Sequence, residues 1–258
     1  MNNIYVNNVG VTFGKDMGFD KQTLVGQLIS FGMIRINTRP ILNLIPQDKL
    51  VESDYRKIIT ELGQIDREQT TFADILESDY QWRYIISNPK KYGINLNSPN
   101  QQKRSIGRII GDTWIDTHLY FTRGHWLRAK YDQVTAAKTK SYQDFMLSEM
   151  TKKNQDNFSA MYTRLIVEVS FLRLVQIQAA IQLYNLEKKR FPKSLDELKP
   201  YFQSIPLDPF SDKPFLWATD SIGRPFAYSV GPDFKDDSAK IIYDPTNGTT
   251  SAGDIQPN

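Results

Sequence analysis

Apolar residues recur every three to four positions along most of the chain between residues 20 and 190. That spacing places them on one face of an α-helix, so it predicts a series of amphipathic helices. The first follows Asp20, a residue type that caps helix N-termini, and runs through "KQTLVGQLISFGMIRI" until Pro40 and Pro46 interrupt the pattern. The same period returns in "KLVESDYRKIITELGQI", in "TTFADILESDYQWRYIIS" and, after a polar loop, in "RSIGRIIGDTWIDTHLYFTRGHWLRAKYDQV". These segments predict a helical N-terminal region.

The longest helical pattern, "MYTRLIVEVSFLRLVQIQAAIQLYNLEKKR", covers residues 161–190. Its apolar stripe includes Leu165, Leu172 and Leu183. Its last turn is basic, which is favourable at the negative end of a helix dipole. We expect one long helix here, packed along its apolar stripe.

After residue 190 the pattern becomes shorter and richer in turns. Ser194 and Glu197 stand three positions apart, the spacing of a capping box that opens a short helix. "KPFLWATD" and "RPFAYSV" are short aromatic strand candidates on either side of the turn signal "DSIG", and they predict a β-hairpin. We therefore expect an α+β fold with two domains. Residues 1–156 form a helical domain, and in residues 157–258 a long helix packs on a small antiparallel sheet that ends in an acidic loop.

Composition narrows the kinds of site the chain can carry. The 258 residues include no cysteine, which excludes disulfides, thiolate metal sites and cysteine nucleophiles. Residues 191–258 hold six basic and ten acidic side chains, a net charge of −4, which leaves +7 for residues 1–190 out of the total of +3. Because this positive charge is spread along the chain rather than clustered, we expect no nucleic-acid partner. The start, "MNNIYVNNVG", lacks the pattern of a signal peptide and leaves the compartment open.

Three stretches occur in order between Ala179 and Ile255: "AAIQLYNLEKKRFPKSLDEL", "IPLDPFSDKPF", and "YSVGPDFKDD" with a closing "AGDI". Together they resemble the globular part of the major pseudopilin of bacterial type II secretion. That family has a helix ending in a turn and an aromatic-Pro pair, a Pro-x-Asp-Pro stretch, a Tyr-Ser-x-Gly-x-Asp loop and a terminal Asp-Ile. The resemblance implies a pilin-like, extracytoplasmic unit. The family's apolar N-terminal helix and its Gly-Phe-x-x-x-Glu motif have no counterpart here, and an unrelated helical region stands in their place.

The resemblance also implies a calcium ion, because the closing loop of the family commonly binds one. Asp233 matches the Gly-x-Asp position and Asp254 matches the Asp-Ile position. Asp236, Asp237 and Asp244 have no counterpart and are added because calcium takes about six to eight oxygen ligands. The loop does not follow the EF-hand pattern. A solvated acidic tail, in which Asp and Asn serve the turns, is the alternative that stays open.

A second functional hypothesis is a hydrolase-type enzyme that uses "GDTWIDTHLYFTRGH". In it Asp112 and Asp116 lie four positions apart, and His118 and His125 lie seven apart. Two helical turns, about 10 Å, separate the histidines, so they do not share one metal in the His-x-x-x-His manner. Histidines among large aromatic residues more often pack and form hydrogen bonds than catalyse. The chain also lacks Gly-x-Ser-x-Gly, the dinucleotide glycine pattern and the phosphate-binding loop.

The pattern and the resemblance together favour a non-enzymatic structural or interaction module. We expect it in the periplasm or cell envelope, with other proteins of an envelope assembly as its partners. We expect membrane contact only through an N-terminal anchor that precedes this chain.

Overall fold

The computed structural model describes residues 24–45, 50–69, 71–78, 132, 134–139, 141–150, 158–244, 246 and 251–257. Its named helices are α2 (Leu24–Leu44), α3 (Glu52–Glu68), α6 (Tyr142–Met150) and α7 (Phe158–Lys188), followed by the 3₁₀ helix η3 (Leu195–Tyr201). Four short strands come next: β1 (Leu207–Asp208), β2 (Lys213–Pro214), β3 (Leu216–Thr219) and β4 (Pro225–Tyr228). Each of the two sheets is an antiparallel pair. Helices combined with small antiparallel sheets confirm the α+β class.

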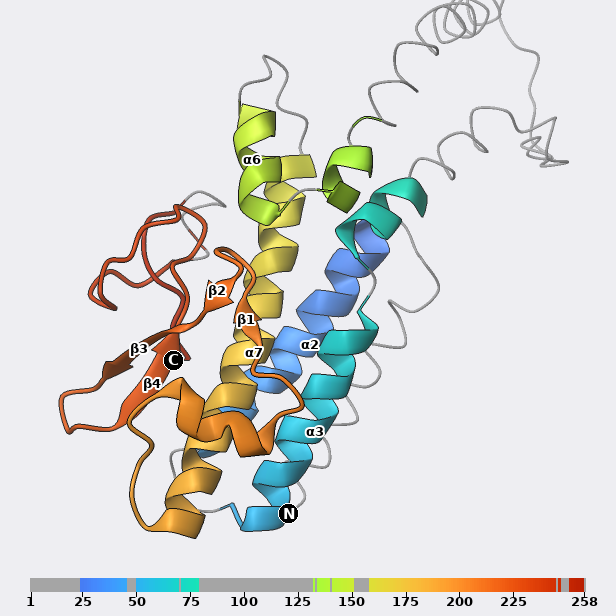
Figure 1. The fold of residues 1–258 in the computed structure, drawn as a ribbon. Coiled ribbons are helices and arrows are strands. Elements are labelled where there is room, and N and C mark those ends of the chain that lie inside the picture. The colour runs from blue at the N-terminus through green and yellow to red at the C-terminus, as the bar shows by residue number, and fades with distance from the viewer. Residues whose placement is uncertain are drawn as a thin grey trace, which may run out of the picture.

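Helix α7 is the central element of the described chain, and it contacts more of the other elements than any other helix or strand (Figure 1). Helices α2 and α3 lie against it, and strand β4, strand β1 and η3 contact it as well. Because neighbours cover several of its faces, most side chains from Leu172 to Tyr184 are buried. A helix that is apolar all round is either a core helix or a membrane span. Ala160–Lys188 is long and apolar enough for both, and 67% of its most apolar stretch is buried inside the protein, so here it serves as the core helix.

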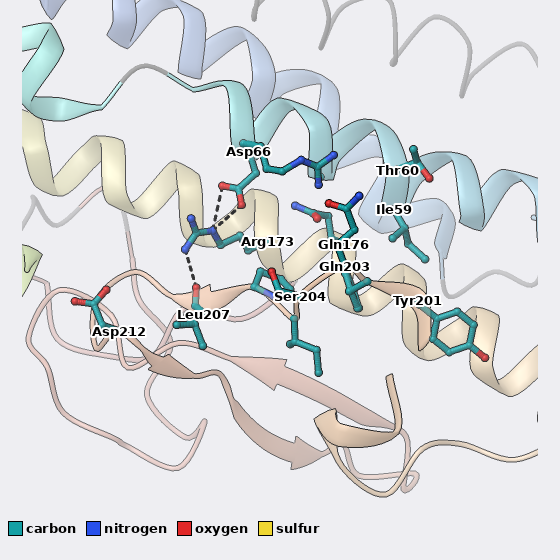
Figure 2. Close-up of a pocket in the computed structure, with 15 residues that line it drawn as sticks. Ile59, Thr60, Asp66, Arg173, Gln176, Tyr201, Gln203, Ser204, Leu207 and Asp212 are labelled. Atoms are coloured by element: carbon teal, nitrogen blue, oxygen red, sulfur yellow. Dashed lines mark hydrogen bonds and ion pairs between the residues drawn. The ribbon is translucent and has the colours of Figure 1, made fainter. Parts of the chain in front are cut away.

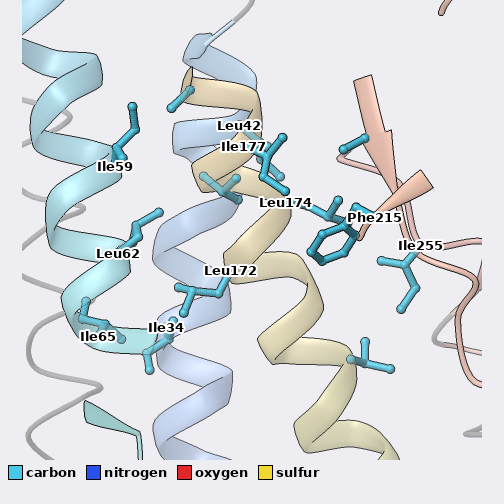
Figure 3. Packing of buried hydrophobic residues seen from close by; sticks show 14 of the residues in the cluster. Ile34, Leu42, Ile59, Leu62, Ile65, Leu172, Leu174, Ile177, Phe215 and Ile255 are labelled. Atoms are coloured by element: carbon cyan, nitrogen blue, oxygen red, sulfur yellow. The ribbon is translucent and has the colours of Figure 1, made fainter. Parts of the chain in front are cut away.

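The core between the helices follows from the spacing of apolar residues on α3. Ile59, Leu62 and Ile65 face the neighbouring helices in Figure 3, where Leu172 of α7 and Ile34 of α2 meet them. Leu62 is only 1% exposed. Fully burying a side chain of this size contributes about 1.5–3 kcal/mol. The amphipathic pattern of α3 is therefore stabilised by packing against α7 rather than by helix propensity alone.

Proline does not end the first helix, contrary to the prediction from sequence. Helix α2 continues to Leu44 with Pro40 inside it. An internal proline costs a helix about 3 kcal/mol, because it removes a hydrogen bond and clashes with the preceding turn. The residues just after it, Ile41, Leu42 and Ile45, are all buried. At about 1.5–3 kcal/mol for each buried side chain, their packing outweighs the cost of the proline.

Strands β3 and β4 form the predicted hairpin. Leu216 lies opposite Tyr228, and Thr219 lies opposite Pro225. The turn between them is fixed by the Asp220 carboxylate, which accepts two backbone N–H groups of the turn at 3.0 and 2.8 Å. This is the local hydrogen bonding that makes aspartate favourable in turns.

The C-terminal tail returns to the hairpin and extends its sheet. Ser229, directly after β4, pairs with Ile255 in antiparallel fashion through two backbone hydrogen bonds of 3.0 and 2.9 Å. Ile242 pairs in parallel with Asp254. Gly253 has φ of +114°, and a Cβ there would lie 2.8 Å from the carbonyl carbon of Ile242. Only glycine fits this close approach.

The capping box predicted at the start of η3 is wrong. The Ser194 side chain makes no capping hydrogen bond, and the helix is a 3₁₀ helix. The Glu197 carboxylate instead accepts a hydrogen bond from the Tyr184 hydroxyl and pairs with Arg190 at 2.9 Å. A charge-assisted bond to arginine is stronger than a bond to a neutral backbone N–H. Glu197 therefore ties η3 to the end of α7 rather than capping its own helix.

The predicted domain boundary between residues 156 and 157 falls outside the described residues and stays a prediction. The hydrophobic core itself is continuous across it. Buried side chains of α2 and α3, from the N-terminal part, belong to the same cluster as those of α7 and the hairpin.

Candidate functional site

The predicted metal loop is the tail that follows β4, and Asp254 lies at its centre. The Asp254 side chain is 0% exposed. Its carboxylate accepts the N–H of Ala239 at 2.7 Å and that of Asp237 at 3.4 Å. Burial raises the pKa of Asp254, the two hydrogen bonds oppose this, and the carboxylates of Asp236 and Asp237 raise it further. Three of the five predicted aspartates are thus close enough to repel one another.

Asp237 has a carboxylate oxygen without a partner. Its Oδ2 atom is buried, and no described residue donates a hydrogen bond to it. Asp236, by contrast, accepts the Tyr228 hydroxyl at 3.0 Å and the Ser238 N–H at 2.8 Å. Leaving a buried acceptor unpaired is unfavourable by roughly 1–3 kcal/mol, and by more when it is charged. An orphaned carboxylate oxygen is also an atom that a bound cation would satisfy.

The loop backbone is bent into unusual conformations around Asp254. Phe234, Ser238 and Ala239 have φ values of 60°, 57° and 59°. Left-handed conformations cost non-glycine residues roughly 1–3 kcal/mol each and persist only where their surroundings hold them. The hydrogen bond from the Ala239 N–H to Asp254 is one such restraint. The Asp254 carboxylate therefore helps to organise the loop.

The other two predicted ligands serve local turns. Asp233 accepts the Lys235 N–H at 3.2 Å, and Asp244 accepts the N–H and the hydroxyl of Thr246 at 2.8 and 2.7 Å. These two bonds lower the pKa of Asp244. Within the described residues there is no group of three or more acidic, histidine or cysteine side chains placed to hold a metal ion. The carboxylates of Asp236 and Asp237 are near enough to act on the pKa of Asp254, whereas Asp233 and Asp244 accept hydrogen bonds within their own turns.

The four residues of the enzyme hypothesis lie outside the described residues. Asp112, Asp116, His118 and His125 all fall in the undescribed stretch between residues 79 and 131. The enzyme hypothesis therefore stays an alternative.

Asp208 is a structural carboxylate that the sequence analysis did not single out. It is 1% exposed, and four donors surround it. Oδ1 accepts the Ser229 hydroxyl at 2.8 Å and the Phe210 N–H at 3.0 Å, and Oδ2 accepts the Ser211 hydroxyl at 3.2 Å and the Val230 N–H at 3.3 Å. Burial raises the pKa of Asp208, and these bonds oppose the rise. Asp208 therefore links the β1–β2 turn to the end of β4 through hydrogen bonds. The sequence feature that could have indicated this role is the Asp-Pro pair of "PLDPF".

Figure 2 shows a cleft between α3, α7 and residues 201–207, with a volume of about 450 Å³, that the sequence did not predict. On one side of it the Arg173 Nε lies 3.1 and 3.0 Å from the two oxygens of Asp66. The Arg173 Nη1 donates to the Leu207 carbonyl at 2.8 Å. Burial raises the pKa of Asp66, and the charge of Arg173 lowers it. The pair joins α3, α7 and the segment before β1.

The remainder of this cleft is lined by a mixture of polar side chains, including Gln176, Gln203 and Ser204, and apolar ones such as Ile59 and Phe202. No histidine or cysteine is among its lining residues. The Thr60 hydroxyl donates to a backbone carbonyl of its own helix at 2.8 Å, and the Asp66 carboxylate is held by arginine. Another hydroxyl of the lining, that of Tyr201, donates to the Glu187 carboxylate at 2.7 Å.

The described residues thus include an acidic loop around the buried Asp254, with an unpaired oxygen on Asp237, and a cleft that holds the Asp66–Arg173 pair. A comparison of the chain with protein-family models, with curated proteins and with solved structures finds no match.

Proposed function

We propose that the chain is a non-enzymatic structural or interaction module of the cell envelope, in which residues 157–258 form a pilin-like unit. The observation that carries the proposal is the joint between the hairpin and the tail. Ser229, from "YSVGPD", pairs with Ile255, from "AGDI", so two separate stretches of the resemblance meet in space.

A third stretch of the resemblance reaches the same joint. Asp208, from "IPLDPF", accepts the hydroxyl of Ser229 at 2.8 Å although 21 positions separate them in the chain. Short sequence likenesses that arise by chance have no reason to meet at one point in the fold. A shared architecture gives them that reason, which supports the pilin-like interpretation.

The proposal is tested by locating the protein in the cells that naturally produce it. An antibody against residues 158–257 would follow it through separation of cytosol, periplasm and membranes. We expect the protein in the envelope fractions, and we expect added protease to reach it once the outer layers are opened while the cytoplasmic membrane stays intact. Recovery in the cytosol alone, protected from protease, would contradict the proposal.

We also propose that the acidic loop binds one calcium ion through Asp233 and Asp254, with help from one or more of Asp236, Asp237 and Asp244, and that the ion draws these side chains together. The orphaned Oδ2 atom of Asp237 supports this fit, because it is a buried anionic acceptor without a donor. Burial is the main cause of the raised pKa of Asp254, and the nearby carboxylates of Asp236 and Asp237 add a smaller repulsion. A bound calcium ion supplies the positive charge that compensates this repulsion.

The calcium proposal is tested by thermal unfolding in calcium and in chelator. We expect calcium to raise the midpoint of the wild-type protein, by a stabilisation of about 2.7 kcal/mol at a hundredfold excess over the dissociation constant. Asp237→Asn removes one of the like charges, so in chelator it should raise the midpoint while weakening the response to calcium. Asp196→Asn, at an exposed position paired with Lys199, is the matched control and should keep the full response. Equal wild-type midpoints in both conditions would leave the solvated acidic tail as the correct interpretation.

A further inference from the structure

A second cavity, of about 460 Å³, lies between helix α7, the β3–β4 hairpin and the C-terminal tail. Helix α7 contributes Gln178 and Gln182, the hairpin contributes Phe226, and the tail contributes Ser238 and Gln256. Its volume is within the range of about 300–1,000 Å³ in which proteins bind small ligands. The acidic carboxylates do not line it, but it adjoins them, because the lining residues Ser238 and Ala239 donate backbone hydrogen bonds to Asp236 and Asp254. The cleft of Figure 2 lies elsewhere, against α3.

Two amide groups on α7 line this cavity without hydrogen-bond partners among the described residues. Gln182 is only 7% exposed, and neither its oxygen nor its nitrogen bonds to any described residue. The Oε1 atom of Gln178 is buried and also has no donor. The two positions are four residues apart, so they lie on the same face of the helix. Buried amide atoms are almost always paired in proteins, so the unpaired Oε1 of Gln178, together with the amide of Gln182 that lines the same cavity, marks a place where a ligand can supply the missing bond.

The charge of the cavity restricts the class of ligand. Asp220 and Arg224 both line it, and they pair with each other at 2.8 Å. The Asp220 carboxylate also accepts two backbone N–H groups of its turn. Within the described lining no charge is left without a counter-charge. An ionic ligand would therefore lose its hydration without gaining an opposite charge, whereas a neutral polar ligand would not.

We propose that this cavity binds a neutral saccharide. A primary amide presents a donor and an acceptor side by side, which matches adjacent sugar hydroxyls because each of these can both donate and accept. Gln178 and Gln182 provide two such groups, and Gln256 and Ser238 add further polar groups on the tail side. Phe226 and Leu42 supply the apolar surface against which the C–H face of a sugar ring packs. This binding would give the module a role in attachment to glycan, distinct from any calcium in the acidic loop.

The test is calorimetry and thermal unfolding of the full chain with glucose, N-acetylglucosamine, maltose and cellobiose at millimolar concentrations. At least one of them should give saturable heat and raise the unfolding midpoint. Gln182→Leu should abolish that response without lowering the midpoint of the free protein, because the lost amide has no partner to lose. Gln176→Leu is the matched control: Gln176 is also a buried glutamine of α7, 3% exposed, but it faces the other cleft. This variant should keep the response.

Nuclear magnetic resonance of the wild-type protein covers the case in which a variant fails to fold. The side-chain NH₂ signals of Gln178 and Gln182 should shift on titration with the bound saccharide, and that of Gln176 should not. No shift and no heat with any of the four saccharides would overturn the proposal and leave a cavity that holds water only. A response to N-acetylglycinamide in the absence of any saccharide response would overturn it as well, because the site would then recognise amides.

Discussion

Replacing Asp208 by asparagine perturbs the joint between the β1–β2 turn and the hairpin with almost no change in shape. Its two oxygens accept four hydrogen bonds, at 2.8, 3.0, 3.2 and 3.3 Å. Asparagine keeps one acceptor oxygen and replaces the other by an NH₂ group, which faces existing donors. If the oxygen stays with Ser229 and Phe210, the NH₂ meets the hydroxyl of Ser211 and the N–H of Val230. The hydroxyl can turn and accept, but the backbone N–H cannot.

Asp208→Asn therefore leaves at least one buried N–H unpaired. The expected loss of unfolding free energy is about 1–3 kcal/mol. For a chain of this length each kcal/mol lowers the midpoint by roughly 2–4 °C, so we expect a fall of roughly 2–12 °C. The assay is thermal unfolding at neutral pH, with hydrogen exchange reporting faster opening of residues 207–212 and 229–231. Asp220→Asn is not a suitable control, because Asp220 also accepts backbone bonds; the exposed Asp196→Asn is. An unchanged midpoint and unchanged exchange at those residues would refute the assigned role of Asp208.

Three further predictions follow from the core. Leu62→Ala should lower the free energy of unfolding, measured by urea titration, by about 2–5 kcal/mol, because it removes a fully buried side chain from the contact between α3 and α7. A loss below about 1 kcal/mol would contradict that packing. Pro40→Ala should raise the free energy of unfolding by about 2 kcal/mol, because it removes the helical cost of about 3 kcal/mol and loses the roughly 0.4–1 kcal/mol that proline contributes by restricting the unfolded chain. A lower melting midpoint would show that α2 does not continue through this position. Burial raises the pKa of Glu168, so the folded protein holds the Glu168 proton more tightly than the unfolded chain does. The stabilisation that this proton gives is present at pH values below the ordinary pKa, and it is lost as the pH rises through the raised pKa. Glu168→Gln should flatten that part of the stability-pH curve, and an unchanged curve would contradict the assignment.

The elements that the sequence predicted well are those in which local pattern and tertiary packing agree. The long helix was expected at residues 161–190 and is found as Phe158–Lys188, because its apolar residues face neighbours on several sides. The hairpin follows from two short aromatic strands and a turn with Asp220, whose own hydrogen bonds close it. In both cases neighbours in sequence carry enough information to fix the element.

The predictions that were wrong concern positions whose local structure is determined by residues far away in the sequence. Pro40 stays helical because of buried residues after it, and the energy of that burial comes from other helices. Glu197 leaves its predicted cap because Arg190 and Tyr184 compete for its carboxylate. The spacing of residues along α7 did not predict which cavity each of its glutamines lines. Gln176 lines the cleft against α3, and Gln182 lines the cavity beside the hairpin. Both cavities are formed by chain segments that meet only in the folded state.

The candidate metal site was predictable only in part. Resemblance and composition pointed to the tail, and they identified Asp254, which is the buried residue that organises the loop. They did not separate Asp236 and Asp237, which interact with it, from Asp233 and Asp244, which serve turns. That distinction depends on the left-handed bends at residues 238 and 239, which no spacing rule encodes.

The most direct measurement of the central claim is hydrogen exchange of the whole chain in calcium and in chelator, followed by mass spectrometry of its peptides. If calcium closes the tail on the hairpin of a pilin-like unit, exchange of residues 231–255 should slow in calcium, with the backbone N–H groups of Ala239 and Ile255 among those protected. Exchange of α3, which contacts α7 on another face, should stay the same. Identical exchange of the tail in both conditions would contradict the claim.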